Sequence, residues 1–90
     1  MADLTREEIE DAVKRSRTLE NSNLADVDLS GANLNGAKLS GSDLSNANLM
    51  GANLHRADLS VTDLSGANLL ETDLSEAKLR VAKLREAELR

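Results

Sequence analysis

Leucine occupies every fifth position from Leu19 to Leu89, fifteen times without a gap. On an α-helix, five residues turn the chain by about 140°, so these leucines would spiral around the surface instead of forming a stripe. On a flat strand, a step of five would place them alternately on opposite faces. To bury all of them together, the chain must turn a corner within each group of five residues and coil around its own leucines.

Each group of five residues repeats more than its leucine. The side chain two positions before the leucine is small, and the side chain directly before it is polar, as in Asn33 and Asp58. The small residue is alanine in nine repeats and differs at Ser22, Val27, Ser42, Thr62 and Thr72. Two inward positions therefore alternate with outward polar positions. We interpret each repeat as one short pleated side followed by a turn.

This pattern resembles the pentapeptide-repeat family, whose consensus is commonly written A(D/N)LXX. The clearest matches begin at Ala32, Ala47, Ala52, Ala57 and Ala67, and the similarity spans residues 22–90. The resemblance implies an all-β solenoid, a right-handed quadrilateral β-helix with four pentapeptides per coil and about three and a half coils. Many relatives place phenylalanine at some central positions, and this chain contains none.

Four pentapeptides per coil would stack residues that are twenty positions apart, at a strand spacing of about 4.8 Å. Lys38, Asp58 and Lys78 would then form one column of alternating charge, and Arg56 would lie next to Glu76. Asp43 and Asp63 would also stack, which brings like charges together. Taken together, the outer residues favour a coil of twenty residues, in which each residue stacks on the one twenty positions later.

The turns are expected to differ along the chain. Gly31, Gly36, Gly41 and Gly51 lie two positions after a leucine, where a type II turn requires a positive φ. Val61 and Val81 occupy the same position, and a β-branched residue disfavours positive φ. We therefore predict a different turn at these two valines.

The amino-terminal segment has the pattern of a helix from Met1 to Arg17. Thr5 and Glu8 form a capping-box pattern, and Leu4 and Ile9 form a hydrophobic staple around it. We expect residues 1–18 to be a capping helix and residues 19–90 to be the repeat domain. The helix would cover the first coil, and binding of a partner by the helix is the alternative.

The carboxyl-terminal segment, from Glu76 onward, keeps the leucine period but is also rich in helix-forming residues. The last coil could be helical, could meet the same end of another copy, or could continue in a longer protein. We favour end-to-end pairing as a homodimer, because an uncovered strand edge invites pairing. The expected interface comprises Leu79, Leu84 and Leu89.

Composition narrows the partners. The formal net charge is −5, which disfavours nonspecific binding of nucleic acid. No apolar run approaches a membrane span, no cysteine is present, and no targeting segment is recognisable, so we expect a cytoplasmic protein whose partner is another protein or itself. No cofactor or metal site is expected.

Candidate catalytic groups are sparse. His55 is the only histidine, and we interpret it as a surface residue. The serines after the leucines are interpreted as turn residues with no base placed to activate them. Asp43 and Asp63 could share a cation in principle, but two solvated carboxylates are the simpler interpretation. The sequence indicates that the protein is not an enzyme.

Two apolar pairs are candidate contacts with a partner. Met50 and Leu70 follow their leucines directly and should point outward, one above the other. Val61 and Val81 pair in the same way at another corner.

Two functions follow from these observations. The first is a structural or protein-interaction module that pairs through its end. The second, drawn from the resemblance, is imitation of DNA by an acidic rod that inhibits a type II topoisomerase such as gyrase. The shortness of the rod and the excess of basic residues after residue 76 count against the second.

Overall fold

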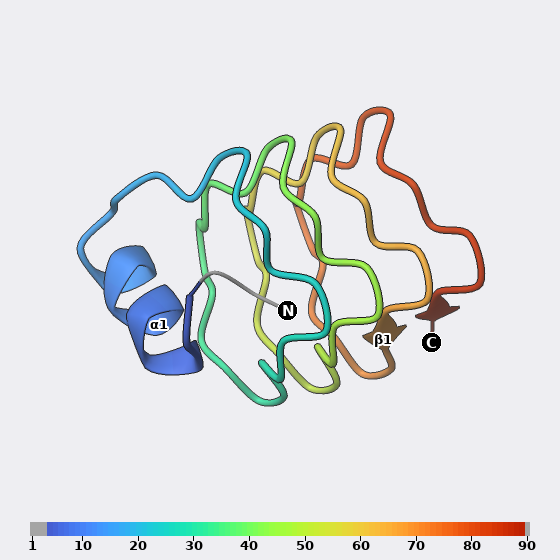
Figure 1. Cartoon of the computed structure of the whole chain (residues 1–90), viewed down its shortest axis with the longest axis horizontal. Helices are drawn as coiled ribbons and strands as arrows, with labels where there is room; N and C mark the ends of the chain where they lie inside the picture. Colours follow the sequence, from blue (N-terminus) through green and yellow to red (C-terminus); the bar gives the residue numbers. More distant parts are fainter. Residues whose placement is uncertain (1–3, 90) are drawn as a thin grey trace.

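A computed structural model describes residues 4–89 of the chain. Its elements are the helix α1 (Arg6–Lys14) and two short strands, β1 (Asn68–Leu69) and β2 (Glu88–Leu89). Between them the backbone runs as a regular series of turns and single β-bridges. Figure 1 shows this segment as stacked loops, with α1 at one end of the stack and the carboxyl-terminal coil at the other.

The loops are held together by parallel bridges between residues twenty apart. Asp43 bridges to Asp63, Asp58 bridges to Lys78, and β1 pairs with β2 in the same register. Twenty residues are four pentapeptides, so each coil returns to the same side after four repeats. The bridges therefore have the register that the charges of the outer residues indicate, and Arg56 Nε lies 3.2 Å from Glu76 Oε1, as that register predicts.

The leucines fill the centre of the stack. Every leucine of the repeat series from Leu24 to Leu64 is fully buried, and the alanines two positions before them are buried as well. At Ser42 and Thr62 a hydroxyl replaces alanine and donates to a backbone carbonyl of the preceding coil, from Ser42 Oγ to Leu19 O at 2.7 Å and from Thr62 Oγ1 to Leu39 O at 3.0 Å. Buried polar groups are tolerated here because they are hydrogen-bonded.

All the corners use one kind of turn. The residue two positions after each leucine has a positive φ, from 58° at Asn21 to 74° at Gly41. The next residue donates its N–H back to the leucine carbonyl, as from Ala32 to Leu29 at 3.0 Å. The prediction of a different turn at Val61 and Val81 is wrong, because both have φ of 59°. The inter-coil hydrogen bonds before and after the corner fix the backbone and override the preference of valine.

Where the residue before a leucine is aspartate or asparagine, its side chain stabilises the following corner. Its side-chain oxygen accepts the N–H of the residue just after the leucine, as from Ser30 to Asp28 at 3.1 Å and from Met50 to Asn48 at 3.1 Å. Aspartate and asparagine have side chains of the length that this Asx turn needs, and the hydroxyl of Thr18 makes the same bond to the N–H of Glu20 at 3.1 Å. The geometry accounts for the preference for these two residues at this position.

The helix α1 begins with the predicted capping box, which the structure confirms. Thr5 Oγ1 accepts the N–H of Glu8, and Glu8 Oε1 accepts the N–H of Thr5. The predicted end at Arg17 is wrong, since the helix stops at Lys14. Ser16 adopts φ of 57°, and Arg17 donates its N–H to Ala12 O at 2.8 Å, which is the Schellman arrangement that terminates helices. Residues 1–3 of the predicted helix lie outside the described residues.

The carboxyl-terminal segment continues the coil. This segment does not form a helix, although its residues favour one. Ala77 and Ala82 donate their N–H groups to the preceding leucine carbonyls, as the equivalent residues of the earlier coils do, and Glu88 donates its N–H to Ala67 O at 2.9 Å. The helical alternative for the last coil is therefore wrong for the described residues up to Leu89. Arg90 lies outside them.

Candidate functional site

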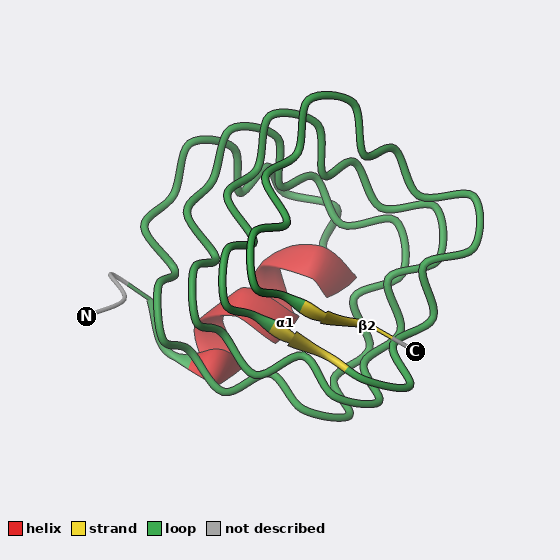
Figure 2. Cartoon of the chain, turned by 90° about the vertical axis from the view of Figure 1, so that its right-hand side faces the viewer, coloured by secondary structure: helices red, strands yellow, loops and turns green. Residues whose placement is uncertain are grey.

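The two ends of the stack differ in what covers their leucines. At the amino-terminal end, α1 packs against the first coil, and Ile9 joins the same buried cluster as Leu19 and Leu24. At the other end, Leu79 and Leu84 are only half-buried and Leu89 is 55% exposed. Figure 2 looks onto this second end, with α1 behind the coils. The predicted interface residues Leu79, Leu84 and Leu89 thus lie together on a surface that no other residue of the described range 4–89 covers, and we call this surface the open end.

Backbone groups at the open end also lack partners. In the coil below, Leu59 and Leu64 donate their N–H groups to Lys78 O and Lys83 O at 2.7 and 2.8 Å. The corresponding N–H groups of Leu74, Leu79 and Leu84 find no acceptor among residues 4–89. Unpaired strand donors and acceptors are a template for adding a further strand.

Charge divides the rim of the open end into two halves. The four walls of the last coil carry, in chain order, Asp73, Lys78, Lys83 and Glu88 directly before their leucines. Two adjacent walls are therefore acidic, and the other two are basic. The basic excess of this segment is visible along the sequence, but its arrangement around the coil appears only when residues twenty apart are stacked.

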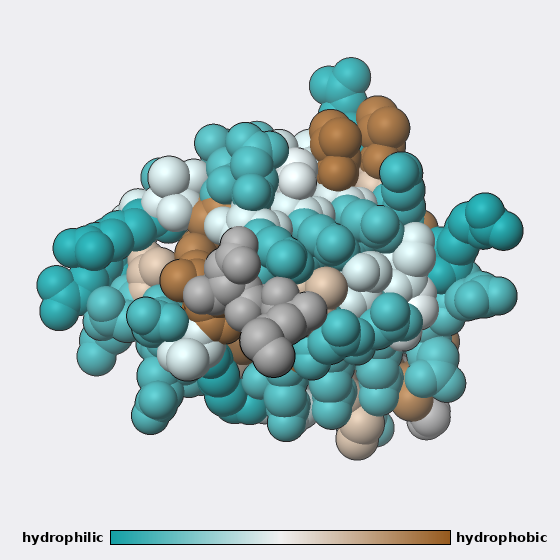
Figure 3. All heavy atoms as spheres, viewed as in Figure 1, coloured by the Kyte–Doolittle hydropathy of each residue, from teal (hydrophilic) through white to brown (hydrophobic). Residues whose placement is uncertain are grey.

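The two apolar pairs lie at corners on the side walls of the stack, and Val81 belongs to the last coil itself. Met50, Val61 and Val81 are 45%, 58% and 77% exposed, whereas Leu70 is half-buried. The register brings Met50 next to Leu70 and Val61 next to Val81. The face shown in Figure 3 is mostly hydrophilic, with hydrophobic side chains protruding in a small group at one edge.

His55 contacts a serine twenty residues further along the chain. His55 Nδ1 is 2.7 Å from Ser75 Oγ, and Ser75 Oγ donates to Asp73 Oδ1 at 2.6 Å. The hydroxyl is placed between the other two groups, whereas in a serine hydrolase the histidine takes that central place. Because the proton of Ser75 is directed at Asp73, this group is not an activated nucleophile.

The same serine lowers the pKa of Asp73 below its ordinary value. The largest cause is the hydrogen bond from the Ser75 hydroxyl, followed by the bond from its backbone N–H. At Asp28 the pKa is lowered chiefly by the backbone N–H of Ser30 and next by its hydroxyl. Both effects favour the charged carboxylate and stabilise a corner.

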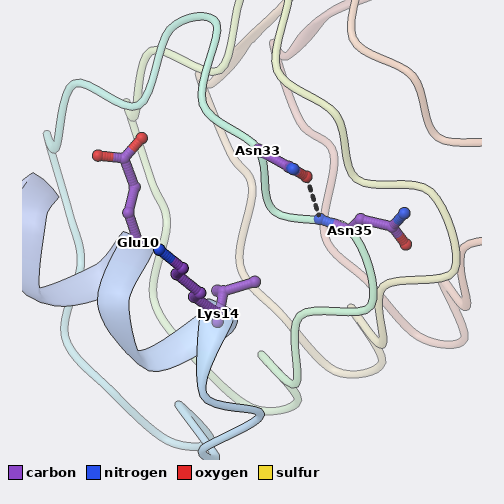
Figure 4. A pocket seen from close by; sticks show the side chains of 5 residues that line it. Glu10, Lys14, Asn33 and Asn35 are labelled. Atoms are coloured by element: carbon purple, nitrogen blue, oxygen red, sulfur yellow. Dashed lines mark hydrogen bonds between the residues drawn. The ribbon is translucent and has the colours of Figure 1, made fainter.

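One hollow lies between α1 and the facing coil, with a volume of about 540 Å³. It is lined by Glu10, Val13, Lys14, Asn33 and Asn35. In Figure 4, Asn33 is turned to the backbone N–H of Asn35, to which it is bonded at 3.2 Å, and Glu10 and Lys14 extend from the helix. None of these lining side chains is both charged and buried. Within residues 4–89 no group of histidine and acidic side chains is placed to hold a metal ion.

The repeats match a family model described as pentapeptide repeats (8 copies), over residues 18–51, 28–66 and 52–90. The chain belongs to the pentapeptide repeat family. Members of this family are generally structural or interaction modules and are not known as enzymes. No curated protein matches the sequence.

Several solved pentapeptide repeat structures are similar to the chain. Rfr23 from the cyanobacterium Cyanothece 51142 shares 37% identity over 82% of this chain and 48% of its own, with a TM-score of 0.47. HetL from Nostoc sp. strain PCC 7120, involved in regulation of heterocyst differentiation, shares 29% identity over 81% of this chain and 47% of its own, with a TM-score of 0.44. A protein from the thylakoid lumen of Arabidopsis thaliana shares 22% identity over 94% of this chain and 59% of its own, with a TM-score of 0.47. The chain spans about half the length of the first two structures.

Among the described residues, no helix combines the length and the apolar character that crossing a bilayer requires.

Proposed function

We propose that the chain is a right-handed quadrilateral β-helix, closed at one end by α1, that acts as a non-enzymatic interaction module and pairs with a second copy through its open end. Twenty residues per coil over residues 19–90 give about three and a half coils. The observation that carries this proposal is the contrast in burial: Leu59 and Leu64 are fully buried, whereas Leu79 and Leu84, one coil later, are half-buried.

A second copy suits this surface for two reasons. The open end presents leucines that lose contact with water on pairing, which is the main favourable term in association. It also presents backbone donors and acceptors together, so two identical edges can satisfy each other. The cross-section of the chain is at most 28 by 23 Å, and such a face buries on the order of 1,000 Å² in total, at the lower end for specific interfaces.

The mass of the protein in solution tests the pairing. Sedimentation or light scattering should give the monomer mass of 9.6 kDa in dilute solution and approach twice that value as the concentration rises to about 1 mM. Leu89→Glu places a charge at the centre of the pairing surface and should weaken dimerisation at least about tenfold. A protein that stays monomeric at the highest concentration contradicts the proposal.

Met50→Glu is the matched control, because it makes the same kind of change on a side wall of similar exposure. It should leave the mass unchanged. If Met50→Glu weakens dimerisation as much as Leu89→Glu does, the contact lies on the side wall instead.

The side-wall pairs are a second candidate contact, for a protein other than the chain itself. Replacing Met50 and Leu70 by serine removes the larger pair without touching a buried leucine. We expect the doubly substituted protein to keep its fold and its dimerisation but to lose protein partners that the unchanged protein captures from an extract of the native cell. We expect both the protein and these partners to be cytoplasmic. Identical captured proteins would eliminate this contact.

Inhibition of gyrase stays a prediction drawn from relatives. An acidic surface imitates DNA only where it is continuous, and Lys78, Arg80, Lys83 and Arg85 interrupt it. A supercoiling assay with the purified chain is expected to show no inhibition at micromolar concentration.

A further inference from the structure

Asn35 and Gly36 form the one Asn-Gly pair of the sequence, and Gly36 is a corner of the first coil. Asparagine is a chemically labile residue, and it loses its amide when the backbone nitrogen of the next residue attacks the side-chain carbonyl carbon. Glycine in that next place favours the reaction, because it has no Cβ to hinder the approach. The other seven asparagines are followed by leucine, serine or alanine. The sequence therefore singles out Asn35 as the reactive amide.

The surroundings of this pair do not shield it by packing. The side chain of Asn35 is exposed, and in Figure 4 it points away from α1. A Cβ added at Gly36 would meet no atom within 4 Å, so water reaches the backbone there as well. Crowding by neighbouring side chains is therefore not what preserves the amide.

Hydrogen bonds hold the backbone of the pair instead. Gly36 donates its N–H to His55 O in the next coil at 2.8 Å, and Ala37 donates its N–H to Leu34 O at 3.0 Å across the corner. The attacking nitrogen must first lose its proton. An amide proton held in such a hydrogen bond is released only when the bond opens, as hydrogen exchange shows in folded proteins.

We propose that Asn35 is a site of spontaneous deamidation, and that opening of the hydrogen bond between Gly36 and His55 controls its rate. In the open corner, Gly36 N gives up its proton and forms a bond to Asn35 Cγ. The Cγ–Nδ2 bond breaks, and the Nδ2 group takes up the proton and leaves as ammonia. Water then opens the resulting cyclic imide at either of its two carbonyl carbons. The reaction needs no oxidant, reductant or other reactant.

The two products affect the stack differently. Water that attacks Cγ leaves an ordinary aspartate at position 35, with an unchanged main chain and one more negative charge. Water that attacks the main-chain carbonyl carbon leaves an isoaspartate, whose main chain is longer by one methylene. The extra length displaces Gly36 from His55 O and Ala37 from Leu34 O, and these two bonds fix the corner. An isoaspartate thus converts a transient opening of the first coil into a permanent one.

The helix α1 sets how often this corner opens. It packs on the first coil, where Ile9 is completely buried in the same cluster as Leu19 and Leu24. Segments with few buried contacts open locally more often than well-packed ones. When closing is faster than the reaction, the reaction rate follows the open population. Loss of packing at Ile9 should therefore speed the loss of the Asn35 amide.

Peptide mapping by mass spectrometry, after incubation of the full chain at mildly alkaline pH, measures the loss of each amide. In the chemically denatured chain, Asn35 should react faster than every other asparagine. In the folded chain, it should react at least about tenfold more slowly than in the denatured chain. Gly36→Ala is the chemical control, because the equivalent corner at Val61 holds a side chain. It should abolish the preference for Asn35 in the denatured chain.

Ile9→Ala should raise the folded-state rate at Asn35 at least about threefold. Leu89→Ala removes the same number of atoms at the other end of the stack and should leave that rate unchanged. A low concentration of denaturant should raise the rate in the unchanged chain, which keeps the test decisive if Ile9→Ala does not fold. Equal rates in the folded and denatured chains would overturn the proposal, as would equal effects of the two alanine variants or a rate that denaturant does not alter.

Asn35→Asp separates the effects of the two products. Its main chain is unchanged, so the amide of Gly36 should still exchange slowly with solvent. In the isoaspartate form, isolated from the aged protein, the same amide should exchange rapidly. Slow exchange in both forms would show that the stack tolerates the longer main chain, and would refute the permanent opening.

Discussion

The first and last coils have nearly the same repeat, yet they differ in two physical respects. The first coil lies under α1, and its corners use Asn21, Asp26, Gly31 and Gly36, which tolerate a positive φ. The last coil is uncovered, and its corners use three glutamates and a valine in the same conformation, at positions 71, 76, 81 and 86. A regular repeat therefore does not imply uniform stability. The neighbours of a coil and the residues at its corners decide how firmly it is held.

The largest expected effect comes from the helix that covers the first coil. Ile9 is completely buried between α1 and the leucines, so Ile9→Ala should lower the free energy of unfolding by about 2–5 kcal/mol. Leu89→Ala removes the same number of atoms from a position that is 55% exposed and should cost less than about 1 kcal/mol in dilute solution. Chemical denaturation at low concentration measures both. Equal losses would show that the two ends are covered alike.

The corners give the next largest effect. Val81→Gly relieves a β-branched residue of a positive φ and should raise the free energy of unfolding by about 1 kcal/mol. Gly31→Val is the reverse change, at a corner where an added side chain would meet no atom within 4 Å, and should lower it by a similar amount. Thermal unfolding of both variants sharpens the comparison of the coils. A stabilising Gly31→Val would refute the role given to the corners.

The capping box of α1 contributes on a similar or smaller scale. Thr5→Ala removes the acceptor for the N–H of Glu8 and should lower the free energy of unfolding by about 0.5–2 kcal/mol. Ser40→Ala, which alters a corner hydroxyl preceded by Lys38 instead of an aspartate, serves as the control and should change it by less than about 0.5 kcal/mol. Since the capping box stabilises only the end of the stack that α1 covers, the rate of amide hydrogen exchange in the last coil should not change in Thr5→Ala.

Acid should have the smallest of these effects. The pKa of Asp28 and that of Asp73 are lowered in the folded state from an ordinary value of 3.8. The stability they contribute is thus complete above about pH 4 and is lost as the pH falls through the lowered values. Thermal unfolding at about pH 6 and about pH 3 should show this loss. Asp73→Asn keeps an oxygen that can close the corner but removes the charge, so it should make the loss smaller.

Much of the fold could be predicted because the repeat is strong. The leucine period indicated coiling, the outer charges indicated the register of twenty, and Thr5 and Glu8 located the start of α1. The turns at Val61 and Val81 could not be predicted from residue preference, because hydrogen bonds to the neighbouring coils impose the backbone there. The helix end was missed because Ser16 gives no glycine signal for a Schellman motif.

The candidate site was only partly predictable. Leu79, Leu84 and Leu89 were placed together by the period alone, and their exposure followed from the register. The contact between His55 and Ser75 could also have been predicted, since these residues are twenty positions apart and therefore stack. It does not appear in any motif of residues that are adjacent along the chain. The division of the rim into acidic and basic halves likewise appears only when the sequence is wound into coils.

Hydrogen exchange of the leucine amides tests the central claim most directly. The amides of Leu44 and Leu59 donate to the next coil at 2.8 and 2.7 Å, so they should exchange slowly at every protein concentration. Those of Leu79 and Leu84, which find no acceptor among residues 4–89, should exchange rapidly in dilute solution and become protected as the chain dimerises. Slow exchange of Leu79 and Leu84 in the dilute monomer, or rapid exchange of Leu44, would contradict a leucine-centred stack that is closed at one end and open at the other.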